Sequence, residues 1–222
     1  GMSFLMSGEM DMAEKMFVHT IKLFDNLKMT GRSYTLGSLI ANCYIGEIYR
    51  MRGEYSKAMS YFLYCVETTE NMGLYWGRSY FLTHAANLAF DIGDYGMMAF
   101  YIDKASSFFE SCQGGRCGSI LYSLKAVSEA HKGRMDLAIA ALSAGEIFLR
   151  SVARKEWLAA QCMAKAIVTS KMTPSERAVY PDREVISLSP EEWAETAASL
   201  FQKCGYAARA ERLVKNFAEK AD

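Results

Sequence analysis

Two cysteines, Cys112 and Cys117, lie in the stretch SCQGGRCGS at residues 111–119, with four residues between them. This spacing could hold a metal, close a disulfide or wrap a phosphate, and it could equally form a turn between helices. A structural zinc site needs four ligands, usually from two such pairs, and the sequence has no second Cys-x(2–4)-Cys pair. A phosphate loop needs Gly-x4-Gly-Lys-Ser/Thr after a strand, which is also missing. We expect a turn without metal or phosphate.

Cys117 could also be a reactive thiol, because it follows Arg116 at the expected start of a helix, a setting that lowers a thiol pKa. The other cysteines lie inside helical apolar patterns. Six cysteines spread over 222 residues do not make the dense framework of a disulfide-rich secreted domain. We expect reduced thiols and a cytoplasmic location; the four cysteines in apolar patterns are Cys43, Cys65, Cys162 and Cys204.

Three histidines, His19, His84 and His131, are the remaining candidates for chemistry. They lie far apart in the sequence, which contains no His-Glu-x-x-His, Gly-x-Ser-x-Gly or paired-carboxylate arrangement. An isolated histidine on a helix is more often partly exposed than catalytic. We therefore predict no enzymatic activity, no metal and no cofactor.

The composition narrows the class of protein. Lys+Arg and Asp+Glu both number 25, so the formal net charge is zero, which argues against direct binding of nucleic acid. Half of the residues are hydrophobic (51%), as in a folded protein. No apolar run reaches the length of a membrane span, and the N-terminus lacks a signal-peptide pattern. We expect a folded protein that does not enter a membrane.

An internal repeat organises the chain. Segments that begin at Gly53, Gly93 and Gly133 align at a spacing of 40 residues, and a fourth begins at Gly8. Apolar residues at helical spacing precede and follow each glycine, which predicts a helix, a tight turn and a second helix. The second helices share two apolar positions, occupied by Ala13, Ala58, Met98 and Ala138, and four residues later by Phe17, Phe62, Ile102 and Leu142. Such helix pairs bury their apolar faces by stacking.

This pattern resembles the tetratricopeptide repeat. The resemblance covers nearly the whole chain and is carried best by Ile45-Gly46, Tyr49, Gly53, Tyr55, Ala58, Phe62 and Cys65. Two features depart from it: Asn42 replaces the first consensus tryptophan, and the period is longer than the roughly 34 residues of that family. The longer period is similar to that of tetratricopeptide-like arrays in the C-terminal halves of bacterial signal-transduction ATPases and transcription activators. The final segment EEWAETAASLFQKCGYAARAERLVKNF looks like their closing repeat.

The resemblance implies an all-α, right-handed superhelical array of antiparallel helix pairs, a tetratricopeptide-like α-solenoid. It implies a non-catalytic scaffold for a protein or peptide, as the regulatory or sensor part of a bacterial signalling or transcription regulator. The alternative is a receptor that binds a small inducer or a peptide in the concave groove.

The three prolines, Pro174, Pro181 and Pro190, divide the chain. Residues 1–171 form the repeats, 172–188 form a linker with a short helix, and 189–222 form a terminal helix pair that continues or caps the array. Thr173-Pro174 and Ser189-Pro190, each followed by a glutamate at the third helical position, predict two helix starts.

The first helix of each pair should line the concave groove. The repeat register places nine partner-binding candidates there: Cys43, Glu47, Arg50, Tyr80, Thr83, Asn87, Ser123, Val127 and His131. The paired lysines and asparagines of the carboxylate clamp, known in chaperone-binding members of the family, are not reproduced. A C-terminal peptide carboxylate is therefore not the expected ligand.

A similar joint precedes three of the first helices, as GRSY at 31–34 and 77–80 and as GRCG at 115–118. We expect Ser33, Ser79 and Cys117 to cap helices. The recurring arginines, Arg32, Arg78 and Arg116, are expected to make local contacts; the alternative is a basic ladder for an acidic partner.

The N-terminus should expose an apolar edge. Asp11–Leu27 forms a second helix, and only the short segment GMSFLMS precedes Gly8, so Met2, Phe4, Leu5 and Met6 resemble the last turn of a truncated helix. Such an edge is covered either by upstream repeats of a longer protein or by another copy. We expect self-association, with contacts from Met6, Met10, Met16 and Phe17.

Overall fold

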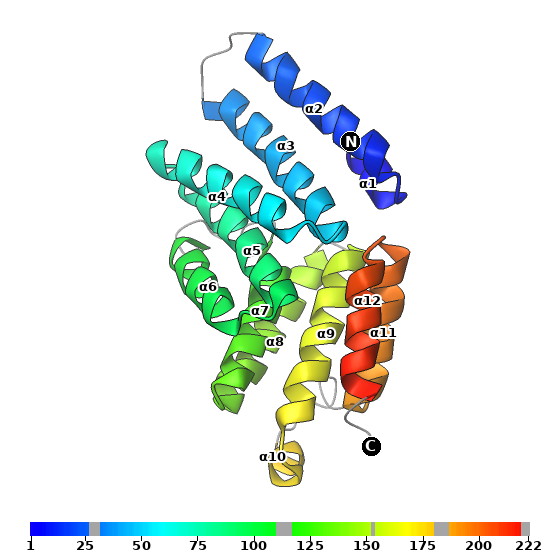
Figure 1. The fold of residues 1–222 in the computed structure, drawn as a ribbon. Helices are drawn as coiled ribbons and strands as arrows, with labels where there is room; N and C mark the ends of the chain where they lie inside the picture. Colours follow the sequence, from blue (N-terminus) through cyan, green and yellow to red (C-terminus); the bar gives the residue numbers. More distant parts are fainter. Residues whose placement is uncertain (27–31, 110–116, 152–153, 180–186, 219–222) are drawn as a thin grey trace. The chain divides into compact units, whose positions relative to one another are not determined.

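The computed structural model describes residues 1–26, 32–109, 117–151, 154–179 and 187–218, and within these ranges it is all-α, without a strand (Figure 1). None of the described helices has the length and apolar character that a membrane crossing requires. The helices are α1 (Met2–Met6), α2 (Met10–Asn26), α3 (Arg32–Met51), α4 (Tyr55–Asn71), α5 (Tyr75–Ile92), α6 (Tyr95–Phe109), α7 (Gly118–His131), α8 (Met135–Ser151), α9 (Lys155–Lys171), α10 (Pro174–Val179), α11 (Pro190–Lys203) and α12 (Ala207–Ala218).

The chain divides into two compact units, Gly1–Gly115 and Arg116–Asp222. In unit 1, each helix from α1 to α6 packs against the next one along the chain. In unit 2, α7 packs on α8, α9 packs on both α7 and α11, and α11 packs on α12. This packing agrees with the predicted helical array. The expected boundary after residue 171 falls inside unit 2, so that division of the chain stays a prediction.

The four repeat glycines form the turns that the sequence predicts. Gly8, Gly53, Gly93 and Gly133 have φ angles of 83°, 80°, 83° and 71°, a region that favours glycine because it has no Cβ. At Gly53 the backbone N–H donates to the carbonyl of Arg50, and the next N–H donates to Tyr49. The same pair of hydrogen bonds closes the helix before each of the other three glycines. This is the Schellman turn, and it converts each helix pair into a tight hairpin.

The repeat register is also confirmed by burial. Ala13, Ala58, Met98 and Ala138 are all fully buried, with an exposed fraction of 0%. The residues four positions later, Phe17, Phe62, Ile102 and Leu142, are at most 6% exposed. The second helix of each hairpin therefore presents the same two positions to its neighbours.

The two predicted starts around the prolines are present. The Ser189 hydroxyl accepts a hydrogen bond from the Glu192 N–H, and the Glu192 carboxylate accepts one from the Ser189 N–H, so α11 begins with a capping box. Thr173 and Glu176 make the same reciprocal pair at the start of α10.

The prediction of an inter-repeat turn at GRSY, just before α5, is wrong. GRSY at 77–80 lies inside α5, and the preceding turn is at Gly73, with φ 64°. Ser79 is not a cap, since its hydroxyl donates to the Ala105 carbonyl at 2.9 Å. Gly77 instead permits close packing of α4 on α5, because a Cβ there would come within 2.9 Å of Thr69 Cγ2. At 77–80, GRSY therefore serves helix packing and does not form a turn.

The other two expected caps differ from each other. Ser33 falls inside α3. Cys117 is the N-cap residue of α7, as predicted, although its side chain makes no capping hydrogen bond. Cys112 and Arg116 lie outside the described residues.

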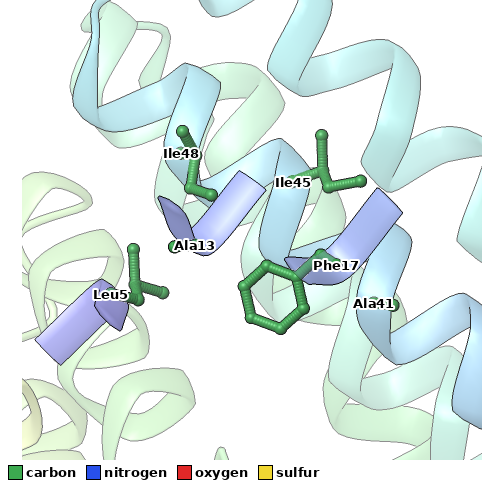
Figure 2. Packing of buried hydrophobic residues seen from close by; sticks show 6 residues of the cluster. All are labelled: Leu5, Ala13, Phe17, Ala41, Ile45 and Ile48. Atoms are coloured by element: carbon green, nitrogen blue, oxygen red, sulfur yellow. The ribbon is translucent and has the colours of Figure 1, made fainter. Parts of the chain in front are cut away.

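Unit 1 begins with an apolar cluster that joins α1, α2 and α3. Figure 2 shows its buried members, Leu5, Ala13, Phe17, Ala41, Ile45 and Ile48. The ring of Phe17 is stacked on Tyr44, with 5.2 Å between the centroids. Met2, Phe4 and Met10 are partly buried against the same cluster.

This cluster corrects the expected self-association contacts. Because the turn at Gly8 folds α1 onto α2, Phe17 is 6% exposed and Leu5 is 9% exposed. Phe17 is therefore a core residue and cannot contact another copy of the chain. Met10 packs against the same cluster. Met16 is half-buried, and the Met6 side chain lies outside the described part of the chain. Self-association itself remains a prediction.

Candidate functional site

The candidate site lies between α3 and α5 in unit 1. Cys43, Glu47 and Arg50 share one face of α3, because they are spaced by four and three residues. The same spacing rule aligns polar residues along α5. The two helices pack together, and the polar faces meet.

A network of four charged or titratable side chains joins these faces. The Arg50 guanidinium donates to Glu47 Oε2 through Nη2 at 2.6 Å and through Nε at 3.1 Å. Its Nη1 donates to Asp91 Oδ2 at 2.6 Å and so crosses from α3 to α5. The His84 Nδ1 atom lies 2.7 Å from Glu47 Oε1. We call Glu47, Arg50, His84 and Asp91 the α3–α5 charge network.

The network is buried, with exposed fractions from 3% to 9%. Burial alone raises the pKa of Glu47, but the Arg50 guanidinium and then the His84 ring outweigh it, so the pKa lies below its usual value. Glu47 and Asp91 carry two negative charges and Arg50 carries one positive charge.

Aromatic rings enclose the histidine. The Tyr80 ring meets His84 edge-on at a centroid distance of 4.7 Å, and the Phe62 ring lies at 5.6 Å. The Thr83 hydroxyl donates to the Ser79 carbonyl within α5. The two ring contacts position the imidazole against Glu47.

This geometry makes the network a clamp between helices. Glu47 is held by two partners and its low pKa keeps it charged, so it is a weak base. Arg50 is bound to two carboxylates at once. Removing one member of such a buried set typically costs about 3–5 kcal/mol, because its partner is left charged and unpaired.

The predicted groove positions are not an exposed surface. Eight of the nine are buried, with exposed fractions of 0–8%, and only His131 is exposed. The buried ones are Cys43, Glu47, Arg50, Tyr80, Thr83, Asn87, Ser123 and Val127. The physical reason is that the first helices have several neighbours: α5 packs on α3, α4 and α6, and α7 packs on α8 and α9. Whether these residues act in partner binding stays a prediction.

Sequence reasoning missed two members of the network. His84 was expected to be partly exposed, and it is buried; Asp91 was not singled out. A signal was present, because Tyr80, His84, Asn87 and Asp91 follow each other at spacings of four, three and four and so share one face of α5.

Unit 2 has its own polar contacts, which centre on α9. The Ser123 hydroxyl lies 2.8 Å from Gln161 Oε1, and Gln161 Nε2 donates to the Leu142 carbonyl at 2.7 Å. Lys165 is paired with Glu146, and its ammonium lies 4.7 Å from the Trp193 ring centroid. These contacts join α9 to α7, α8 and α11, and the sequence did not reveal them.

Burial disfavours the reactive thiolate form of three described cysteines. Burial raises the pKa of Cys65 to about 12 and that of Cys162 to about 11, and it also raises the pKa of Cys204. Cys117 is 3% exposed, which is unlike the accessible setting of a reactive thiol. No disulfide joins the cysteines of the described ranges.

The local interpretation of the recurring arginines is supported at one position. The Arg78 guanidinium lies 4.3 Å from the Phe108 ring centroid and is paired with Glu70. The side chains of Arg32 and Arg116 are outside the described residues.

Across the described ranges, no three His, Cys, Asp or Glu side chains gather as metal ligands would. Cys112 lies outside the described ranges, so the expectation that the chain holds no structural zinc remains a prediction.

No family model matches the sequence, and no curated protein matches it either.

Proposed function

We propose that the chain is a non-catalytic protein–protein interaction module, a tetratricopeptide-like array whose helix pairs wind into a right-handed superhelix. One observation carries the proposal: the same glycine-closed hairpin recurs at Gly8, Gly53, Gly93 and Gly133, with equivalent positions buried in each. Stacked repeats of this kind present extended surfaces, and such surfaces serve to bind proteins and peptides.

Exposed apolar side chains on the second helices support this function. In unit 1, Tyr64 on α4 and Phe100 on α6 are each 53% exposed. In unit 2, Ile147 on α8 is 68% exposed. Large aromatic side chains supply much of the binding energy at protein interfaces. The Lys104 ammonium lies 4.5 Å from the Phe100 ring centroid, so this position offers both apolar contact and a positive charge.

The proposal extends to the biological setting. The period of 40 residues and the final hairpin of α11 and α12, closed at Gly205 with φ 82°, resemble the arrays of bacterial signalling and transcription regulators. We therefore propose a regulatory or sensor role in signal transduction or transcription regulation. A cytoplasmic location is part of this proposal and rests on the reduced, buried thiols.

Site-specific photo-crosslinking tests the proposal. A photoreactive amino acid replaces Tyr64 or Phe100 in cells, and Lys203, an exposed residue of α11, is the control position. The expected result is a discrete crosslinked protein from the first two positions and not from the third. Failure to crosslink at both positions, together with stoichiometric stabilisation by a small molecule, would favour a ligand receptor and overturn the proposal.

A further inference from the structure

The outer side of α8 exposes large apolar side chains. Within unit 2, α8 packs on α7 and α9 (Figure 1), and Ala138 and Leu142 are fully buried. On the other side, Leu137 is 52% exposed and Ile147 is 68% exposed. Across the described ranges, no other large apolar side chain is as exposed as Ile147.

Two alanines lie between these residues. Ala140 is exposed and Ala144 is half-buried. Leu137, Ala140, Ala144 and Ile147 follow each other at spacings of three, four and three, so they lie on one face of the helix. We call these four residues the α8 face.

The α8 face lacks charges that its counterparts on other second helices carry. At the position of Ala144, α6 has Lys104, and at the position of Ile147, α4 has Glu67; both charged residues are exposed. Charged residues are depleted at the centre of protein interfaces. The α8 face therefore differs from its counterparts in the way that an interface requires.

The α8 face reads the same in both directions. Its side chains are large, small, small and large, and the spacings of three, four and three are symmetric. A two-fold axis brings such a face onto itself, because each residue then meets its mirror position in the other copy. In an antiparallel pair centred at Leu142, Leu137 meets Ile147 of the second copy, and Ala140 meets Ala144. The alanines let the two helices approach closely.

Opposite charges lie at the two ends of the α8 face. Asp136 is in the first turn of α8 and Arg150 is in the last turn, and both are exposed. Within the described ranges Arg150 makes no ion pair. An antiparallel pair places Asp136 of each copy near Arg150 of the other, twice. A parallel pair would place like charges together, which is unfavourable.

We infer that the α8 face binds the α8 face of a second copy of this chain, with the two helices antiparallel. The symmetric order of sizes and the charges at opposite ends are both requirements of a two-fold contact, and a different partner protein would need neither. The 17 residues of α8 extend over about 26 Å. One such helix pair buries less than the roughly 1,200 Å² at which stable interfaces begin, so the dimer dissociates in the micromolar range.

This contact goes beyond the proposed function and is separate from it. It leaves Tyr64 and Phe100 of unit 1 available to a partner protein. It is also separate from the self-association that the apolar N-terminal segment predicts.

The test is sedimentation equilibrium of the full chain over a series of micromolar concentrations. The expected result is a monomer–dimer equilibrium. Ala140→Glu should raise the dissociation constant at least about tenfold, because it buries like charges near the two-fold axis. Ile147→Ser should weaken the dimer as well. Leu158→Ser, at a residue of α9 that is 44% exposed, is the matched control and should leave the equilibrium unchanged.

A charge exchange tests the antiparallel orientation. Asp136→Lys alone and Arg150→Glu alone each place like charges opposite one another, and each should raise the dissociation constant roughly three- to tenfold, since two exposed ion pairs are lost. The double variant with both substitutions restores opposite charges and should return to the original affinity. Neither a parallel pair nor a loss of folding would give that recovery.

Three outcomes overturn the inference. The first is a monomer at every concentration. The second is a dimer on which Ala140→Glu has no more effect than Leu158→Ser, and a dimer that Phe4→Ser dissociates instead would belong to the N-terminal segment. The third is a double charge variant as weak as the single ones. Crosslinking from Tyr64 and Phe100 reports on the proposed function by itself, so the two can fail separately.

Discussion

Substitution of Gly46 by alanine tests how closely α3 approaches α4. A Cβ atom at Gly46 would lie 2.7 Å from Phe62 Cε1 and 3.1 Å from Tyr61 Cβ, and the first distance is shorter than real Cβ contacts allow. Phe62 is fully buried, so its ring has little room to move away. The helix backbone at Gly46 accepts alanine, so the clash alone opposes the substitution.

Two effects of opposite sign decide the outcome. Alanine is favoured over glycine inside a helix by up to about 1 kcal/mol. Overpacking of a close-packed core costs about 1–3 kcal/mol. Because the short contact is with a fully buried ring, we expect the second effect to win. Gly46→Ala should lower the free energy of unfolding by about 1–2 kcal/mol, net of both effects.

Gly96 provides a matched control in α6. A Cβ there would meet only Asp94 Oδ1, at 3.4 Å, and the residue is exposed. Gly96→Ala should therefore raise the free energy of unfolding by about 0.5–1 kcal/mol. Urea unfolding followed by far-ultraviolet circular dichroism measures both variants. In a chain of this size, each kcal/mol also moves the melting temperature by about 2–4 °C.

A double-mutant cycle separates the clash from other effects. Phe62→Leu alone should destabilise by leaving space in the core, but it should cost less in the Gly46→Ala background, where it relieves the contact. If Gly46→Ala proves as stable as the unmodified chain, or if the two substitutions are simply additive, the close approach of α3 and α4 is wrong.

Three further predictions concern single side chains. The low pKa of Glu47 in the folded state means that its charge stabilises the fold above the unfolded value near 4.5, and this contribution is lost as pH falls below that value. Glu47→Gln should remove this contribution to the pH dependence and cost about 3–5 kcal/mol at neutral pH, because Arg50 loses a buried carboxylate partner. An unchanged pH profile of urea unfolding would contradict the ion pairs. Ser189→Ala should cost about 1 kcal/mol through loss of the α11 cap, measured in the same way, and a neutral result would mean that the capping box is absent in solution. Cys65 and Cys162 should react with iodoacetamide much more slowly in the folded chain than in denaturant, and equal rates by mass spectrometry would show that the thiols are not buried.

The hairpins could be predicted because their causes are local. A glycine at positive φ ends a helix by its own backbone preference, and the spacing of 40 residues marks Gly53, Gly93 and Gly133 as equivalent. The burial of Ala58 and Phe62 on one helix face then follows from helical periodicity alone.

The charge network could not be predicted because its causes are not local. Arg50 and Asp91 are 41 residues apart, and only the packing of α3 on α5 brings them together. Periodicity correctly grouped Tyr80 and Asn87 on one face of α5, but it does not say what covers that face. At this step the structure differs from the expected exposure, since eight of the nine groove positions lie in the interior. Their role in partner binding stays a prediction.

The GRSY motif shows a different limit. The same four letters at 31–34 and 77–80 suggested a shared turn, yet Gly77 is inside α5 and serves the approach of α4. A glycine needed for close packing and a glycine needed for a turn are the same letter in a sequence.

Isothermal titration of the chain with the protein crosslinked from Phe100 tests the central claim most directly. The proposed function predicts saturable binding of one partner per chain, with affinity reduced at least about tenfold by Phe100→Ser, as for an aromatic hot spot, and unchanged by Lys203→Ser. Equal binding of the partner to both variants would contradict the claim that this protein works by protein–protein interaction. So would the absence of any heat of binding with the partner at concentrations where the chain converts a small-molecule substrate or binds a small molecule tightly.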